Sequence, residues 1–142
     1  MPSVTFEEAQ KAVYDHFIAA FHPATLNRDT QICLGTEPFT EPTATNWAYL
    51  QVFEIDPNQD TLGAIGEREW QRRCLAVCEF AIPEDSGDDD MNVLTQLFRD
   101  NFEGVSFDGL DFPEALRVSG STQDGQWTKK ICRAVFDFYE RR

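Results

Sequence analysis

Basic residues are scarce in this sequence, and long apolar runs are missing from it. The 142 residues include 12 Lys and Arg against 25 Asp and Glu, which gives a formal net charge of −13. Such a surface repels the phosphates of nucleic acids and anionic lipids, so sequence-specific DNA or RNA binding is not expected. No apolar run approaches the roughly 20 residues that span a bilayer, and Met1–Gln10 lacks the pattern of a signal peptide. We therefore expect a protein of a cytoplasm that does not enter a membrane.

Enzyme signatures are also absent from the chain. It contains no G-x-S-x-G, no G-x-x-x-x-G-K-[ST], no G-x-G-x-x-G and no H-E-x-x-H motif, so the common nucleophile, phosphate, dinucleotide and zinc sites are not indicated. The two histidines, His16 and His22, have no partners at catalytic or metal-binding spacing and are predicted to be exposed or hydrogen-bonded. We expect no catalytic residue, no cofactor and no bound metal.

The four cysteines form no close C-x-x-C pair of the kind found in structural zinc and redox sites. They are Cys33, Cys74, Cys78 and Cys132. Because cysteine packs as a small hydrophobic residue, the sequence predicts buried free thiols.

Negative charge is concentrated in the segment Glu84–Asp90, where five of seven residues are acidic. Its Asp88-Asp89-Asp90 run could suggest calcium. However, an EF-hand loop alternates its acidic ligands around a central glycine and closes with a glutamate, and this run does neither. We predict helix capping and a solvated acidic face, with fortuitous cation binding as the alternative.

Two amphipathic helices are expected. Thr5 and Glu8 have the spacing of a capping box that opens the first helix, and Pro23 should end it. Gly104 is well placed to stop the second helix. The apolar stripes of the two helices are Phe6, Ala9, Val13, Phe17 and Ala20 in the first, and Met91, Leu94, Leu97, Phe98 and Phe102 in the second.

Strand patterns fill most of the remaining sequence. Residues 36–45 look like an extended loop, Asp56–Gly66 like a protruding hairpin connection, and Asp124-Gly125 like a turn. The order of elements predicts an α+β fold, with a largely antiparallel sheet and two main helices packed on one face, as a single domain over residues 1–142. The expected strands are Gln31–Leu34, Trp47–Ile55, Glu69–Ile82, Leu116–Ser119 and Thr128–Tyr139.

Basic residues gather in the last strand and tail of this acidic chain, and two more, Arg72 and Arg73, lie in the second long strand. Segregated charge can mark a self-complementary contact, and a protruding hairpin commonly contacts a partner; surface ion pairs of little energetic value are the alternative. The candidate residues of a subunit or tube interface are Asp56, Asn58, Asp60, Leu62, Ile65, Arg72, Arg73, Lys129, Lys130, Arg133, Arg141 and Arg142.

Several aromatic, glycine and proline patterns together resemble a known family over nearly the whole chain. They include Glu37–Pro42 leading to Trp47–Val52, the Gly66–Arg73 strand entry, L-x-x-L-F-x-x-x-F-x-G-x-x-F from Leu94 to Phe107, and Gly125-Gln126-Trp127 before Phe136–Tyr139. In these patterns, and in its amphipathic first helix, the sequence resembles the tail-terminator-like, or tail-completion, proteins of long-tailed bacteriophages. The acidic segment before the second helix departs from the resemblance.

The resemblance implies a structural virion protein without catalytic residues. Such proteins form hexameric rings that cap the finished tail tube and give the head a docking surface. The implied partners are further copies of the chain, the tube protein and a head-completion or connector protein. The implied place is the head-proximal end of the tail, after assembly in the host cytoplasm. DNA would pass through an acidic ring without specific binding.

Three other classes of function stay open. Proteins of the same fold serve as head-tail connectors or as tube subunits. A small α+β ligand-binding domain or enzyme would require a pocket with converging polar groups. An acidic adaptor or inhibitor that mimics DNA would be monomeric, so the mass in solution separates it from a ring.

Overall fold

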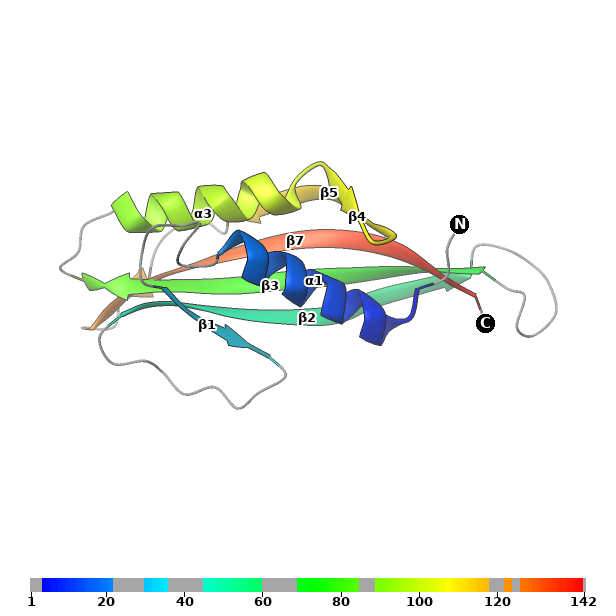
Figure 1. The fold of residues 1–142 in the computed structure, drawn as a ribbon, viewed down its shortest axis with the longest axis horizontal. Coiled ribbons are helices and arrows are strands. Elements are labelled where there is room, and N and C mark those ends of the chain that lie inside the picture. Colours follow the sequence, from blue (N-terminus) through cyan, green and yellow to red (C-terminus); the bar gives the residue numbers. More distant parts are fainter. Residues whose placement is uncertain are drawn as a thin grey trace.

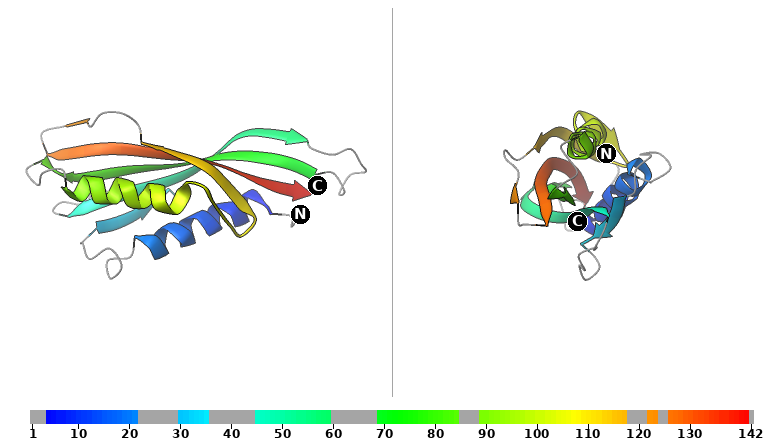
Figure 2. Two further views of the ribbon diagram at one scale, coloured as in Figure 1. Left: turned by 90° about the horizontal axis from the view of Figure 1, so that it is seen from above. Right: turned by 90° about the vertical axis from the view of Figure 1, so that its left-hand side faces the viewer.

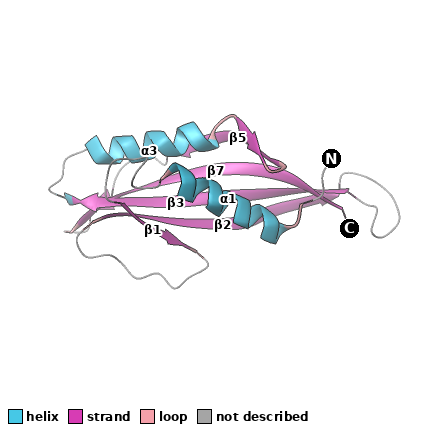
Figure 3. Ribbon diagram, in the orientation of Figure 1, coloured by secondary structure: helices cyan, strands magenta, loops and turns pink. Residues whose placement is uncertain are grey.

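Two long helices lie against one side of a curved sheet in the computed structural model of the chain (Figures 1 and 3). The structure describes residues 4–21, 30–35, 45–59, 69–84, 89–117, 122–123 and 126–141. Helix α1 spans Phe6–Ala20 and helix α3 spans Asp89–Phe102. Seen along the strands, both helices sit on the same side of the sheet (Figure 2, right).

The sheet has the strand order β1-β2-β3-β7-β5-β4, with β6 paired to β7 outside this path. Strand β1 runs parallel to β2, and every other described pairing is antiparallel. The predicted α+β class is confirmed. The strands are β1 Thr30–Leu34, β2 Asn46–Gln59, β3 Glu69–Pro83, β4 Val105–Phe107, β5 Leu110–Arg117, β6 Thr122–Gln123 and β7 Trp127–Arg141.

Helix α1 begins with the predicted capping box. The backbone N–H of Glu8 donates to Thr5 Oγ1 over 3.2 Å, and the Thr5 N–H donates to Glu8 Oε1 over 3.4 Å. These bonds satisfy two amides that the helix cannot pair internally. The buried residues Ala9, Val13 and Phe17 lie on the predicted stripe. Pro23 lies outside the described residues.

Helix α3 has Asp89 and Asp90 in its first turn, where the positive end of the helix dipole favours carboxylates. Asp90 Oδ2 also accepts a 3.0 Å hydrogen bond from Asn46 Nδ2 of β2. The helix ends at Phe102, and Gly104 follows with a φ of 64°, which glycine adopts without steric cost. Residues 85–88 of the acidic segment lie outside the described part.

A short hairpin follows α3 that the sequence analysis did not predict. Strands β4 and β5 are joined by Asp108 and Gly109, with φ of 51° and 81°, and Phe107 pairs with Leu110 across this turn. A two-residue turn with both φ values positive suits the twist of an antiparallel pair, and Asp-Gly is a favoured sequence for it. The strand predicted at Leu116–Ser119 is therefore wrong in its start, since β5 begins at Leu110.

The predicted Asp56–Gly66 connection is also wrong in its start. Strand β2 continues to Gln59, and after a register shift at Glu54 its residues 56–59 pair with 73–70 of β3. Strand β1 pairs with β2 only as far as Leu50, so the rest of β2 has no described neighbour on that side. A proline such as Pro57 is tolerated at an edge of this kind. Asp60, Leu62 and Ile65 lie outside the described residues.

The core lies between the helices and one face of the sheet. The alternation predicted for β3 holds: Cys74, Ala76, Cys78, Phe80 and Ile82 are all buried. We name this helix-covered side the inner face and the opposite side the outer face.

The cysteines are all free, as predicted. Cys74, Cys78 and Cys132 are buried, and Cys33 is partly buried. Burial raises the pKa of Cys74 to about 12, with a smaller contribution from the Glu54 carboxylate, and burial raises the pKa of Cys78 well above its ordinary value. Both thiols therefore stay protonated at neutral pH.

Candidate interaction surface

The outer face of β2, β3 and β7 carries several apolar side chains among its polar ones, and no described element covers it. Antiparallel partners point to the same side, so the register places Phe53, Leu75 and Val135 in one row of this face. Val77 lies in the next row and Ile131 in the row beyond it. Both helices lie on the other side (Figure 2, right).

Two of these side chains are substantially open to solvent: Phe53 is 46% exposed and Ile131 is 38% exposed. Ile55, in the irregular stretch of β2, is 51% exposed. Exposed apolar side chains gathered on one face can mark a binding surface.

Arg133 lies beside Val77 on the same face and is exposed. No carboxylate among the described residues forms an ion pair with it. The two neighbouring cations are paired: Arg73 Nε lies 3.1 Å from Asp137 Oδ1, and Lys129 Nζ lies 3.9 Å from Glu79 Oε1. Among the described side chains of this face, Arg133 is thus a cation that is available to a carboxylate of a partner.

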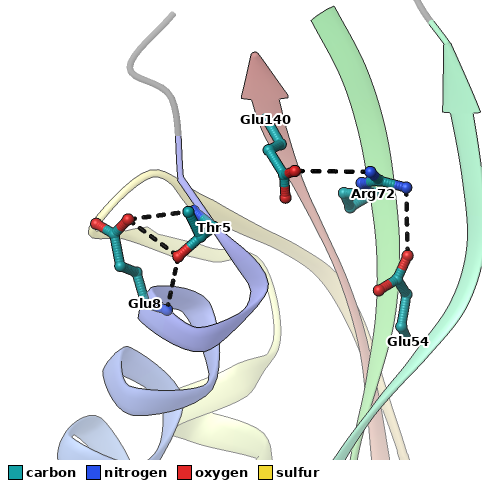
Figure 4. Close-up of polar contacts among 5 residues, drawn as sticks. All are labelled: Thr5, Glu8, Glu54, Arg72 and Glu140. Carbon is teal, nitrogen blue, oxygen red and sulfur yellow. Dashed lines mark hydrogen bonds and ion pairs between the residues drawn. The ribbon is translucent and has the colours of Figure 1, made fainter. Parts of the chain in front are cut away.

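Arg72 was predicted at the interface, but its side chain is only 10% exposed and lies on the inner face. Its guanidinium group sits between two carboxylates, with Nη1 3.4 Å from Glu54 Oε1 and Nη2 3.6 Å from Glu140 Oε1 (Figure 4). The Trp70 ring lies 5.4 Å from its guanidinium carbon. Arg72 therefore ties β2, β3 and β7 together, and is not available to a partner.

The remaining predicted residues are scattered. Lys130 pairs with Phe80 and so lies on the inner side of β7. Strand ends contain Asp56, Asn58 and Arg141. Arg142 and the central part of the β2–β3 connection lie outside the described residues. The structure brings Arg73, Lys129 and Arg133 to one face and separates them from Arg72 and Lys130.

The apolar residues of the outer face were not predicted from the sequence. A signal was available, because Leu75 and Val77 alternate with the core residues of β3, so this strand carries apolar residues on both faces. A second cluster was not predicted either: at one end of the outer face, Trp47, Ala81 and Trp127 are buried. The two indole rings meet edge to face with centroids 6.1 Å apart.

A hollow of about 290 Å³ lies at the other end of the outer face, bordered by Asp111 and Asp137. Both carboxylates are engaged, since Asp111 accepts a 2.9 Å hydrogen bond from Ser106 Oγ and Asp137 pairs with Arg73. Within the described ranges, no three histidine, cysteine or acidic side chains are grouped as they would be around a metal ion.

His16 is hydrogen-bonded, in line with its prediction. Its Nε2 lies 3.1 Å from the Asn101 carbonyl oxygen, and its ring stacks on Phe107 with centroids 3.9 Å apart. His22 is outside the described residues. None of the described helices has the length and apolar character needed to cross a membrane.

No family model matches this sequence, and no curated protein matches it. A solved structure whose name gives no function is similar in fold, with a TM-score of 0.63 and 14% sequence identity. The alignment covers 91% of this chain and 94% of that one. At this identity the match shows the fold alone.

Proposed function

We propose that this chain is a structural virion protein of a long-tailed phage, a tail-terminator-like subunit. Six copies form a ring that caps the tail tube and offers the head a docking surface. In this proposal the chain acts by binding and not by catalysis, and it resides at the head-proximal end of the tail. Its partners are the tube protein and a head-completion or connector protein.

The observation that carries the proposal is the outer sheet face. Phe53 and Ile131 are exposed beside the partly buried Leu75, Val77 and Val135. Exposing these side chains to water has a free-energy cost that burial against a partner recovers, at roughly 25 cal/mol for each Å² removed from water. A role in assembly accounts for this face, which a solvated sheet would fill with polar residues.

The resemblance to tail-terminator-like proteins gives the assembly its biological setting. Its patterns fall in fold-forming elements: Trp47–Val52 lies in β2, Leu94–Phe107 runs through α3 and β4, and Phe136–Tyr139 lies in β7. The net charge of −13 fits a ring through which DNA slides without adhering. Occupying the tube end would block further tube subunits without any chemistry, because repeated weak contacts add up in a ring.

Deleting the gene from the phage and imaging the lysate tests the proposal. We expect heads and tails to be made but not joined, and tails to vary in length. A plasmid copy of the intact gene should restore joined particles of uniform tail length. Normal tails attached to full heads in the deletion would refute the terminator role.

A further inference from the structure

Among the described residues, four large hydrophobic side chains are exposed: Ile18, Phe53, Ile55 and Ile131. Phe53 and Ile131 lie on the outer face, and Ile55 follows two residues after Phe53. Ile18 lies elsewhere, on α1, which packs on the inner side of the sheet (Figure 2). The described part of the molecule therefore has two separate regions with exposed apolar side chains.

The second region is a surface groove of about 420 Å³ between α1 and β1, which we name the α1 groove. Its apolar wall consists of Ile18, which is 39% exposed, with Tyr14 and Leu34. A hollow with an apolar wall can receive protruding side chains such as Phe53 and Ile131. Both regions thus expose apolar side chains, which contact between two copies would remove from water.

The charges of the two regions are also complementary. The α1 groove is lined by Glu7, Glu8 and Asp15 against the single cation Lys11. Lys11 Nζ pairs with Asp15 Oδ2 over 2.7 Å, and Glu8 is held in the capping box. Glu7 is exposed and has no ion-pair partner among the described residues. The outer face offers the matching unpaired cation, Arg133.

We propose that the outer face of one copy docks into the α1 groove of a second copy, with Arg133 meeting Glu7 and the exposed apolar residues meeting Ile18. This inference rests on the self-association in the proposed function and names the surfaces that carry it. The two surfaces lie on different sides of the sheet, so each copy can use both at once. Such a head-to-tail contact generates a ring where the rotation between copies closes.

Charge reversal in sedimentation equilibrium of the full-length protein tests the docking. Arg133→Glu should weaken self-association by about tenfold or more, because it places two carboxylates together at the contact. Glu7→Arg should weaken it similarly. The double variant carries the reversed pair on every copy and should recover most of the wild-type affinity.

Two further variants separate charge from apolar burial. Phe53→Thr keeps a residue suited to a strand and should weaken association by about tenfold without changing its salt dependence. Arg99→Glu is the matched control, because Arg99 is exposed on α3 away from both surfaces and pairs with Glu103. It makes the same charge change as Arg133→Glu and should leave association unchanged.

Each other outcome has a definite meaning. A wild-type chain that stays monomeric at every concentration overturns the inference. The proposed function is then tested by the gene deletion alone, because the tube end can template a ring. Association that Glu7→Arg does not affect, but Arg133→Glu does, overturns the inference, because the outer face then meets a surface other than the α1 groove. Association that neither variant affects places the contact elsewhere. Docking as inferred, without binding of the protein to purified tail tubes, overturns the proposed function and leaves the inference intact.

Discussion

The rings of Phe98 and Phe80 meet edge to face with their centroids 6.1 Å apart, and this contact joins α3 to β3. Phe98 is 1% exposed, which confirms the sequence prediction that it belongs to the core. Within α3 it also contacts the ring of Phe102, with centroids 4.9 Å apart. The position of α3 on the sheet therefore depends on this side chain.

Phe98→Ala should lower the free energy of unfolding by about 3 to 5 kcal/mol, because it removes a buried ring and leaves a cavity. Urea unfolding measures the change. Phe53→Ala removes the same atoms from a half-exposed site and should cost much less in dilute protein. Equal costs for the two variants would mean that α3 is not packed as described.

Arg72→Met should destabilise the fold by about 2 to 4 kcal/mol, since it removes a largely buried guanidinium group that bridges the carboxylates of Glu54 and Glu140. Arg73→Met is the neighbouring control. Its side chain is 55% exposed, so loss of its pair with Asp137 should cost no more than about 1 kcal/mol. Thermal melts of both variants measure the two losses of stability. A smaller loss for Arg72→Met than for Arg73→Met would contradict the contacts of Arg72 with Glu54 and Glu140.

Alkaline pH should destabilise the protein through its buried thiols. The pKa of Cys74 is raised to about 12, so between pH 9 and 12 the unfolded chain loses this proton while the folded chain keeps it. The stability that this protonated thiol contributes is therefore fully present below pH 9. Above pH 9, ionisation of the thiol in the unfolded chain lowers the free energy of unfolding by about 1.4 kcal/mol per pH unit.

Urea titrations at pH 7, 9 and 10 on the parent and on Cys74→Ala measure this effect. The cavity left by the substitution should cost the same at each pH, so the stability gap between the two proteins should narrow above pH 9. A gap that stays constant from pH 7 to pH 10 would show that the Cys74 thiol is not shielded from ionisation.

The chain should have no useful affinity for duplex DNA at physiological salt. Non-specific binding is driven by release of counterions when cations neutralise phosphates, and a net charge of −13 opposes it. A gel shift with increasing protein tests this, with a basic DNA-binding protein as the positive control. Micromolar affinity would instead favour a role in handling nucleic acid.

Local patterns in the sequence were enough to predict the two helices and the long strands. Thr5 and Glu8 start α1 through bonds that span only three residues, and the alternation in β3 gives each residue its side of the sheet without reference to the rest of the chain. The Asp108-Gly109 turn was equally local, and was missed because β4, the strand before it, has only three residues.

Only the tertiary structure decided which cations are available to a partner. Arg72 and Arg73 are adjacent in sequence, but in a strand they point to opposite faces, and the helices cover one of these faces. Arg72 is therefore buried between carboxylates from β2 and β7, whereas Arg73 and Arg133 share the outer face. Pairing between strands distant in the chain, which no local pattern encodes, determines which side chains lie together on a surface.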